Sequence, residues 1–291
     1  MERNAALPRP ISFSPDSPPT RRETRFQVSF GVVAVLVIAA PVVSHDLWVV
    51  PGKFLVQPGE KIRVFVNSGD DFPASAARLS EQRIESFVVH SPSATDGPIT
   101  GLVADGQSLT AEVAVLEPGT SMLAIALKPR LIRLKPEEFR QYLEEEGLPQ
   151  FLKLREALGE SNRPAAERYT KWAKAVLKVG EQEDDRWSKP MGLKLEIVPR
   201  TNPHVLHPGD KLTVAVFFDG KPLPDVTVVG GRAGTPPDRV RVVTGSNGEA
   251  SLVLEKPGRW YLRALHMIRL AVDADAEWES FWTTMTFEVR T

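Results

Sequence analysis

The pattern of hydrophobic and polar positions changes twice along the chain, from short strands to helices and back to strands. Residues 61–67 alternate, so that Ile62, Val64 and Val66 share one face of an extended segment. Pro-Gly, Asp-Gly and Ser-Gly turns separate segments of this kind. Such spacing predicts a β-sandwich, with strands at 47–50, 54–56, 61–67, 83–90, 109–115 and 121–128.

The next stretch predicts helices. Apolar side chains recur at helical spacing over 135–146, and Gly147 ends that segment. The same pattern continues over 151–158 and 164–179. In the last segment one stripe gathers Tyr169, Trp172, Ala173, Val176 and Leu177. We expect this stripe to pack on one of the sandwiches; binding of a partner by exposed aromatic side chains is the alternative.

A second set of strand patterns follows the helical stretch. We expect strands at 193–198, 211–218, 227–229, 239–243, 250–254, 259–265 and 281–289. Residues 208–214 repeat the Pro-Gly turn, acidic residue and alternating strand of residues 58–64. This echo indicates either an internal duplication or convergent turn chemistry, since Pro-Gly turns are common.

These patterns predict a mainly β fold class with two β-sandwich domains of Ig-like or transthyretin-like type. The N-terminal sandwich is expected at 45–134 and the C-terminal sandwich at 190–291, with a helical connecting segment at 135–189. Each sandwich is expected to hold its own core.

Residues 1–44 predict a leader ahead of the first sandwich. A Pro- and Ser-rich extension, expected to be disordered, precedes a basic cluster at 21–25 and an apolar run at 31–40. Val42 and Ser44 are the small residues that precede the expected cut. A basic segment, a short apolar run and a small-residue site are typical of a secretory signal peptide.

Cleavage after Ser44 makes His45 the first residue of the mature protein. The alternative is a leader that stays in place as a membrane anchor. The apolar run argues against it, because a helix that crosses a bilayer needs about 20 apolar residues and the run is shorter. Arg21 and Arg22 match a twin-arginine signal only weakly, because Glu23 and a polar residue follow them. We therefore expect export by the general secretory route to a periplasmic or secreted location, with no stable membrane span after leader removal.

The composition narrows the chemistry. The chain has no cysteine, which excludes disulfides, thiolate metal sites and cysteine nucleophiles. Lys and Arg number 36 against 37 Asp and Glu, so charge gives no case for nucleic-acid binding. The sequence contains no Gly-rich phosphate loop, no nucleophile elbow and no helical His-Glu-x-x-His motif. We therefore expect a binding or accessory protein and not an enzyme.

Several segments together resemble a known family. They are 220–228, 244–250, 257–264 and 278–287, with His45-Asp46-Leu47-Trp48 at the start and Gly69-Asp70-Asp71-Phe72-Pro73 after the third strand. With these segments the chain resembles the domain of unknown function 4198 family of exported bacterial proteins, over about 45–287. The C-terminal part also resembles transthyretin-like and carboxypeptidase-regulatory sandwiches.

The resemblance implies a cargo and a partner. Some members of that family are described as periplasmic components associated with nickel or cobalt uptake. It therefore implies an accessory or solute-binding protein that captures a divalent transition metal and passes it to a metal-uptake membrane permease. The alternative is a structural or interaction β-sandwich protein that binds protein or carbohydrate without metal.

His45 is the first candidate metal ligand. After the expected cut it offers an α-amine and an imidazole nitrogen on one residue, and Asp46 adds an oxygen beside them. This donor set suits nickel, cobalt, copper or zinc. The alternative is an ordinary polar residue that lies on the sandwich. A mature N-terminal histidine also occurs in copper monooxygenases, a remote alternative that needs a second histidine beside His45 and an aromatic axial neighbour.

The remaining candidates lie in the second sandwich. His266, with Met267 next to it, is the expected partner of His45, although adjacent strand residues point to opposite faces. His204 and His207 are three apart, but the prolines around them favour an extended loop. The alternatives without metal are that His266 is a histidine at a strand edge and that His204 and His207 are ordinary surface residues. His90 ends a predicted strand and is expected to be a surface residue.

Two further sets of residues are expected to have structural roles. Asp70 or Asp71 is expected to cap a turn by bonding to backbone amides. Trp278 and Trp282 are four apart, so on a strand they share a face and are expected to lie in the core.

The first prediction concerns export. N-terminal sequencing of the protein from a periplasmic fraction should begin at His45, because the basic, apolar and small-residue segments define a cut after Ser44. A mature chain that still begins at Met1 would remove the basis for an amine ligand at His45.

Overall fold

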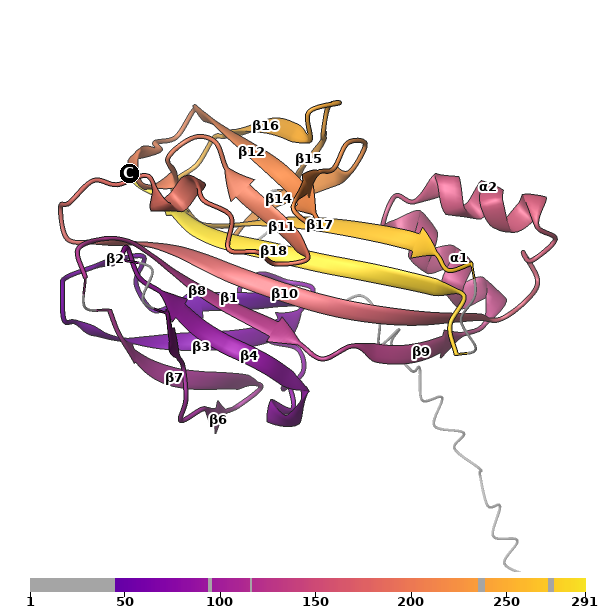
Figure 1. Cartoon of the computed structure of the whole chain (residues 1–291), viewed down its shortest axis with the longest axis horizontal. Helices are drawn as coiled ribbons and strands as arrows, with labels where there is room; N and C mark the ends of the chain where they lie inside the picture. Colours follow the sequence, from indigo (N-terminus) through magenta and orange to yellow (C-terminus); the bar gives the residue numbers. More distant parts are fainter. Residues whose placement is uncertain (1–44, 94–95, 116, 235–238, 272–274) are drawn as a thin grey trace, which may run out of the picture. The chain divides into compact units, whose positions relative to one another are not determined.

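A sheet of ten strands runs through both halves of the chain (Figure 1). The computed structural model describes residues 45–93, 96–115, 117–234, 239–271 and 275–291, so the expected leader lies outside the described residues. The central sheet has the order β15 (Arg239–Val243), β14 (Thr227–Arg232), β17 (Gly258–Arg269), β18 (Trp278–Val289), β10 (Ala165–Val179), β8 (Gly119–Leu127), β4 (Ile84–His90) and β5 (Asp96–Pro98). Two more strands, β2 (Leu55–Val56) and β9 (Arg130–Leu134), also pair with β10.

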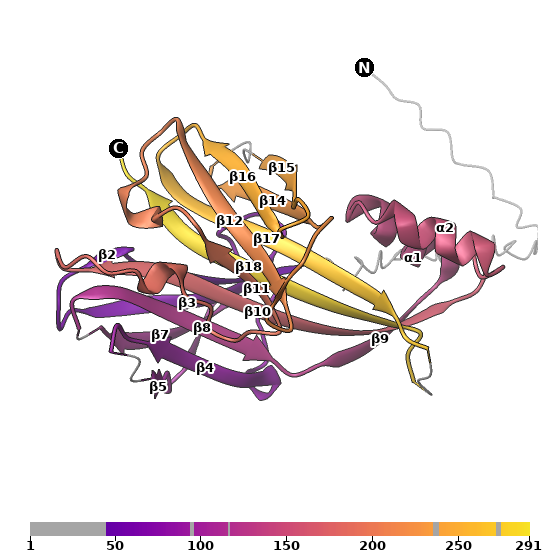
Figure 2. The same ribbon diagram turned by 45° about the horizontal axis from the view of Figure 1, so that its top comes forward.

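Two smaller sheets cover opposite faces of the central sheet (Figure 2). The first sheet contains β1 (Asp46–Pro51), β3 (Lys61–Gly69), β7 (Ser108–Ala114) and β6 (Val103–Asp105). The second contains β11 (Leu195–Pro199), β12 (Asp210–Phe218), β13 (Lys221–Pro222) and β16 (Glu249–Leu254). We call the side under the first sheet face 1 and the side under the second sheet face 2. The prediction of a mainly β fold built from sandwiches is confirmed.

β10 contributes side chains to a core on each face. Ala173 and Leu177 belong to the core under the first sheet, together with Val49 and Ile125. Val176, one residue from Leu177, belongs instead to the core under the second sheet. The alternation of side chains along a strand places these neighbours on opposite faces. The two largest hydrophobic clusters of the described residues therefore share β10, which lies outside both ranges expected for the sandwiches.

The prediction of a helix over 164–179 is wrong, because this segment is the strand β10. Its alanines, lysines and glutamate have good helix propensity, and its apolar stripe fits a helical period. Tertiary packing overrides that preference because β18 pairs with β10 in parallel from Glu167 to Ala175. A strand covered on both faces also lacks the polar–apolar alternation that would have identified it.

The two helices predicted before this strand are present. α1 (Pro136–Glu145) and α2 (Pro149–Ala157) are joined through Gly147, whose φ of 72° suits the left-handed turn that ends a helix. They pack on Trp278 and Trp282, which are buried as predicted. Short 3-10 helices lie in the connections: η1 (Glu81–Arg83), η2 (Arg186–Ser188) and η3 (Pro203–Val205). No helix in the described ranges is long and apolar enough to cross a membrane.

The two similar Pro-Gly segments lead into strands with equivalent places. β3 lies between β1 and β7, and β12 lies between β11 and β16. Gly59 and Gly209 both have positive φ, at 80° and 94°. The equivalence fits a duplication of sandwich type. Independent folding of the units 45–134 and 190–291 stays a prediction.

A buried ion pair joins β10 to the second sheet. Lys174 Nζ lies 2.7 Å from Glu196 Oε1, and both side chains are 1% exposed. Glu196 also accepts hydrogen bonds from the backbone N–H groups of Met191 and Gly192. Each partner therefore satisfies a charge that would otherwise be buried alone.

Truncation of this lysine should strongly destabilise the fold. Lys174→Ala leaves Glu196 buried without its cation, which should cost about 3–5 kcal/mol of unfolding free energy. Arg140→Ala is the control, because Arg140 pairs with Glu144 on the exposed surface of α1, and its loss should cost less than about 0.5 kcal/mol. Urea unfolding measures both. Equal effects would show that the buried pair does not hold the second sheet on β10.

Candidate functional site

His45 lies immediately before β1, on the face 1 side of the central sheet. Its Nδ1 atom is 3.1 Å from Asp70 Oδ1, and its side chain is 25% exposed. Its backbone carbonyl accepts a hydrogen bond from Lys171 Nζ of β10. Asp70 follows β3, which pairs with β1, and this pairing brings Asp70 beside His45. An imidazole and a carboxylate therefore meet at the start of the first strand.

The side chain of Asp70 or Asp71 is predicted to cap a turn. In the part of the chain that the structure describes, the Asp70 carboxylate bonds to the His45 ring, and neither side chain bonds to a backbone amide. The segment 69–73 is part of the family resemblance, but the sequence does not indicate that Asp70 contacts His45. The two residues are 25 positions apart, and only the β1–β3 pairing brings them together.

Asp46 is buried and paired with a cation. Arg263 of β17 lies 3.5 Å from Asp46 Oδ1 and 2.9 Å from Glu146 Oε2. Burial raises the pKa of Asp46 to about 6, although Arg263 and Lys171 lower it. Glu146 caps the C-terminal end of α1, where a carboxylate is unfavourable unless a cation offsets it. Arg263 thus joins the helix end to β1, and Asp46 is engaged in this contact.

Two further titratable groups of β10 are buried next to this pair. Glu167 accepts a hydrogen bond from the Tyr142 hydroxyl at 3.2 Å and another from the Ser280 hydroxyl. Its second carboxylate oxygen is buried without a hydrogen-bond partner among the described residues. Burial raises the pKa of Glu167 to about 7, and burial lowers the pKa of Lys171 to about 8.

A cavity of about 220 Å³ opens between His45 and β10, and we call it the β10 cavity. Its lining includes the His45 ring and the cationic side chains of Arg78, Arg83, Arg130 and Lys171. β9 pairs with β10 up to Tyr169, while β8 pairs with it only from Val176 onward. The cavity lies beside this interruption, where neither strand pairs with β10.

A second cavity, of about 310 Å³, is lined by both members of the Asp46–Arg263 pair. Its charged lining residues are Asp46, Asp70, Glu145, Glu146, Arg239, Arg241 and Arg263. Acidic and basic groups are mixed there. Asp70 contributes to this cavity and also bonds to His45, so it connects the start of β1 with it.

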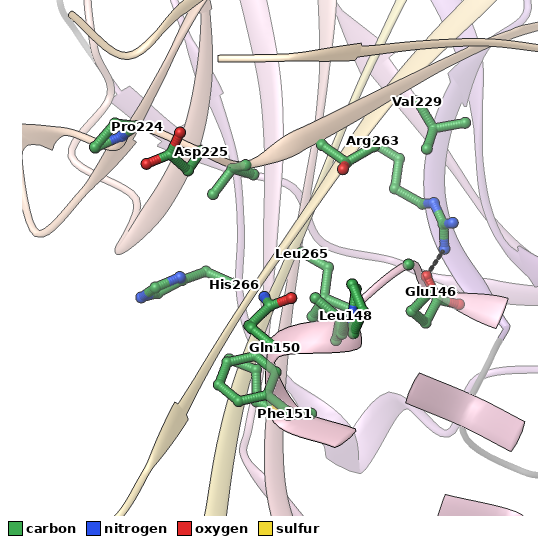
Figure 3. A pocket seen from close by; sticks show the side chains of 15 residues that line it. Glu146, Leu148, Gln150, Phe151, Pro224, Asp225, Val229, Arg263, Leu265 and His266 are labelled. Carbon is green, nitrogen blue, oxygen red and sulfur yellow. Dashed lines mark ion pairs between the residues drawn. The ribbon is translucent and has the colours of Figure 1, made fainter. Parts of the chain in front are cut away.

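His266 lies elsewhere, at a third cavity of about 260 Å³ formed by the turn between α1 and α2, residues 224–227 and β17 (Figure 3). Its ring packs edge-on against Phe218 at 4.6 Å between centroids. Burial lowers its pKa. Figure 3 shows the His266 ring and the Arg263–Glu146 pair on different sides of the β17 ribbon. Met267, its neighbour, faces the helices in the core that includes Trp278.

The structure does not bring His45 and His266 together, so the expected partnership is wrong. His266 pairs in register with Phe281, whose side chain belongs to the face 2 core. Lys171, which bonds to the His45 carbonyl, has its side chain on face 1 with Trp282. Because neighbouring residues alternate between faces, the central sheet separates the two histidines.

His204 and His207 have different surroundings and different partners. His204 is buried in η3, with Nε2 3.1 Å from the Thr120 hydroxyl, and burial lowers its pKa to about 4. The predicted extended loop is therefore a single 3-10 turn at this point. His207 is 60% exposed and lies 3.8 Å from Asp210. His90 ends β4, as predicted.

The described ranges contain no cluster of three or more His, Asp or Glu side chains placed to hold a metal ion. His45 and Asp70 supply two donors, so a metal ion there needs a third donor from another source. Sequence reasoning found His45 and missed Asp70, Arg263 and Lys171 as its surroundings. The only sign of these residues in the sequence was that each is a charged residue within or near a predicted strand or helix. Their partners could not be predicted, because each contact joins residues far apart in the sequence.

Comparison with known proteins identifies a family but no activity. The family model described as "Domain of unknown function (DUF4198)" matches residues 42–268, so the similarity noted at 278–287 lies beyond it. No curated protein matches the chain.

Solved structures with similar features include the D0-D1 domain of Intimin, with 13% identity, 84% of this chain and 98% of that chain covered, and a TM-score of 0.23. A DUF4785 family protein from Legionella pneumophila has 8% identity, coverage of 74% and 50%, and a TM-score of 0.27. The Yersinia pseudotuberculosis adhesin InvE has 12% identity, coverage of 84% and 58%, and a TM-score of 0.23. These likenesses are too distant to carry a functional argument.

The buried carboxyl of Glu167 gives a test by pH. Its pKa is raised from 4.5 to about 7, so the folded chain holds this proton more tightly than the unfolded chain. The resulting stabilisation is fully present below pH 4.5 and is lost as the pH rises through about 7, by at most about 3 kcal/mol.

Glu167→Gln should therefore lose less unfolding free energy than the native chain between about pH 5 and pH 8, because glutamine mimics the protonated form. Chemical unfolding at several pH values measures the difference. Glu156→Gln, an exposed change on α2, should follow the native profile. If the profile of the Glu167→Gln variant runs parallel to the native one, the shifted pKa is contradicted.

Proposed function

The chain belongs to the DUF4198 family, and we propose that it is an exported β-sandwich protein that binds a divalent transition-metal ion at its mature amino terminus. In this proposal the ion is cargo, nickel or cobalt first and copper or zinc as alternatives. The protein is an accessory to uptake that passes the ion to a membrane permease. Its location is periplasmic or secreted.

The observation that carries the proposal is the approach of His45 Nδ1 to Asp70 Oδ1 at 3.1 Å. Cleavage after Ser44 would add an α-amine on the same residue as the imidazole. Two nitrogens and one carboxylate oxygen form a donor set that late first-row metals accept. Asp70 takes the place predicted for His266, and it brings a negative charge that favours a cation.

Asp46 has a supporting role in this proposal. Its carboxylate is buried against Arg263 and is therefore not free to turn towards a metal at His45 without leaving that cation unpaired. The contact instead anchors the first strand, so that His45 is held at a fixed position. A held terminus binds with a smaller entropy cost than a loose one.

Metal-dependent oxidation is less well supported than binding. A copper monooxygenase site needs a second histidine next to His45, and neither cavity beside the start of β1 has another histidine in its described lining. His266 is on the opposite face of the central sheet, as its register with Phe281 indicates. We therefore propose a binding function without catalysis.

Isothermal titration of the mature chain with nickel, cobalt, copper and zinc tests this proposal. Retaining Ser44 ahead of His45 should weaken binding by about tenfold or more, because it removes the amine while the imidazole stays. Asp70→Asn should weaken it by about tenfold, through loss of a charged donor. Affinity should fall as the pH is lowered, since protons compete for the same nitrogens.

His207→Ala is the matched control. His207 also lies near an aspartate, but it is exposed and has no free α-amine to act as a second nitrogen donor. Its loss should therefore leave the metal affinity unchanged. His266→Ala should also have little effect. If the mature chain binds none of the four ions better than the form that retains Ser44, the metal proposal fails. The structural or interaction β-sandwich alternative is then preferred.

A further inference from the structure

The β10 cavity has an unusual charge balance. Arg78, Arg83, Arg130 and Lys171 line it, and its described lining includes no Asp or Glu. The second cavity, which Asp46 and Arg263 help to line, mixes arginines with four carboxylates. The two cavities therefore differ in charge although both lie beside the start of β1.

The positive charges of Arg78, Arg83 and Arg130 are not neutralised by a carboxylate among the described residues. Arg83 donates to two neutral oxygens, the Tyr169 hydroxyl at 3.2 Å and the Lys128 carbonyl at 3.1 Å. Within the described ranges neither Arg83 nor the other two arginines of the cavity forms an ion pair with a carboxylate. Arg78 and Arg130 are exposed at the mouth. A concave site with unpaired guanidinium groups attracts anions.

A fourth cation is fixed at the inner end of the cavity. Lys171 is only 6% exposed and donates to the His45 carbonyl. Its Nζ atom lies 4.7 Å from the ring centroid of Trp282 and 5.4 Å from that of Tyr169. Its position is therefore set by packing, and a buried cation gains from an anion brought close to it.

We propose that the β10 cavity binds a small multivalent oxyanion, a polycarboxylate or a phosphate. Guanidinium groups match both kinds of oxyanion with paired N–H donors. The volume of about 220 Å³ corresponds to about seven water molecules at roughly 30 Å³ each, which suits a compact ligand. Because the arginines come from a loop, η1 and β9, a ligand needs several anionic groups to reach them all.

This site rests on its own charges and does not require a metal at His45. An anion in the cavity would also reduce the repulsion that a divalent cation at His45 meets from the same arginines. Failure of the metal proposal therefore leaves the anion proposal intact, and the reverse also holds.

The test is calorimetric titration of the mature chain with citrate, inorganic phosphate and acetate in metal-free buffer. Citrate or phosphate should bind, and acetate should bind about tenfold more weakly or not at all, because one carboxylate cannot reach three arginines. Affinity should fall as salt is raised. The comparison of citrate with phosphate identifies which oxyanion the cavity prefers.

Arg78→Ala/Arg130→Ala should weaken binding by about tenfold or more, because each lost guanidinium removes a charge-assisted contact. Arg239→Ala/Arg241→Ala is the matched control, since it removes the same charge from the second cavity, and it should change affinity by less than about twofold. All four side chains are exposed, so the folds should be equally stable. The proposal is overturned if neither citrate nor phosphate binds. It is also overturned if both double variants lose affinity equally, or if the Arg78/Arg130 variant keeps it.

Discussion

Burial of β10 on both faces is the constraint on which the rest of the structure depends. The strand pairs in parallel with β18, and its two faces supply alternate side chains to different cores. A parallel pair of strands cannot be joined by a tight turn and needs a longer crossover connection. In this chain the connection between β10 and β18 contains β11 to β17. This connection forms most of the second sandwich. The two sandwiches therefore share the central sheet.

Charged side chains of β10 bind different partners on the two faces of the central sheet. On face 2, Lys174 reaches Glu196 of the second sheet. On face 1, Glu167 accepts from Tyr142 of α1, and Lys171 donates to the His45 carbonyl ahead of β1. Charges that need particular partners make the wrong arrangement costly, because they would be left buried and unpaired.

The same strand shapes the candidate sites. β9 and β8 are consecutive, and both pair with β10, but they leave it between Tyr169 and Val176. The start of β1 covers that interval, which places His45 at the mouth of a cation-lined cavity. The metal and oxyanion proposals therefore concern neighbouring sites that arise from one interruption in sheet pairing.

The sequence by itself determined the mainly β class, most strand positions, the two helices and the burial of Trp278 and Trp282, because these follow from local periodicity and turn chemistry. It also singled out His45 as a candidate metal ligand. Only the tertiary structure decided that 165–179 is a strand, since pairing with β18 outweighed local helix propensity. It likewise decided that His45 meets Asp70 and not His266. Strand pairing brings the first two together, and the alternation of side chains puts the third on the far face of the sheet.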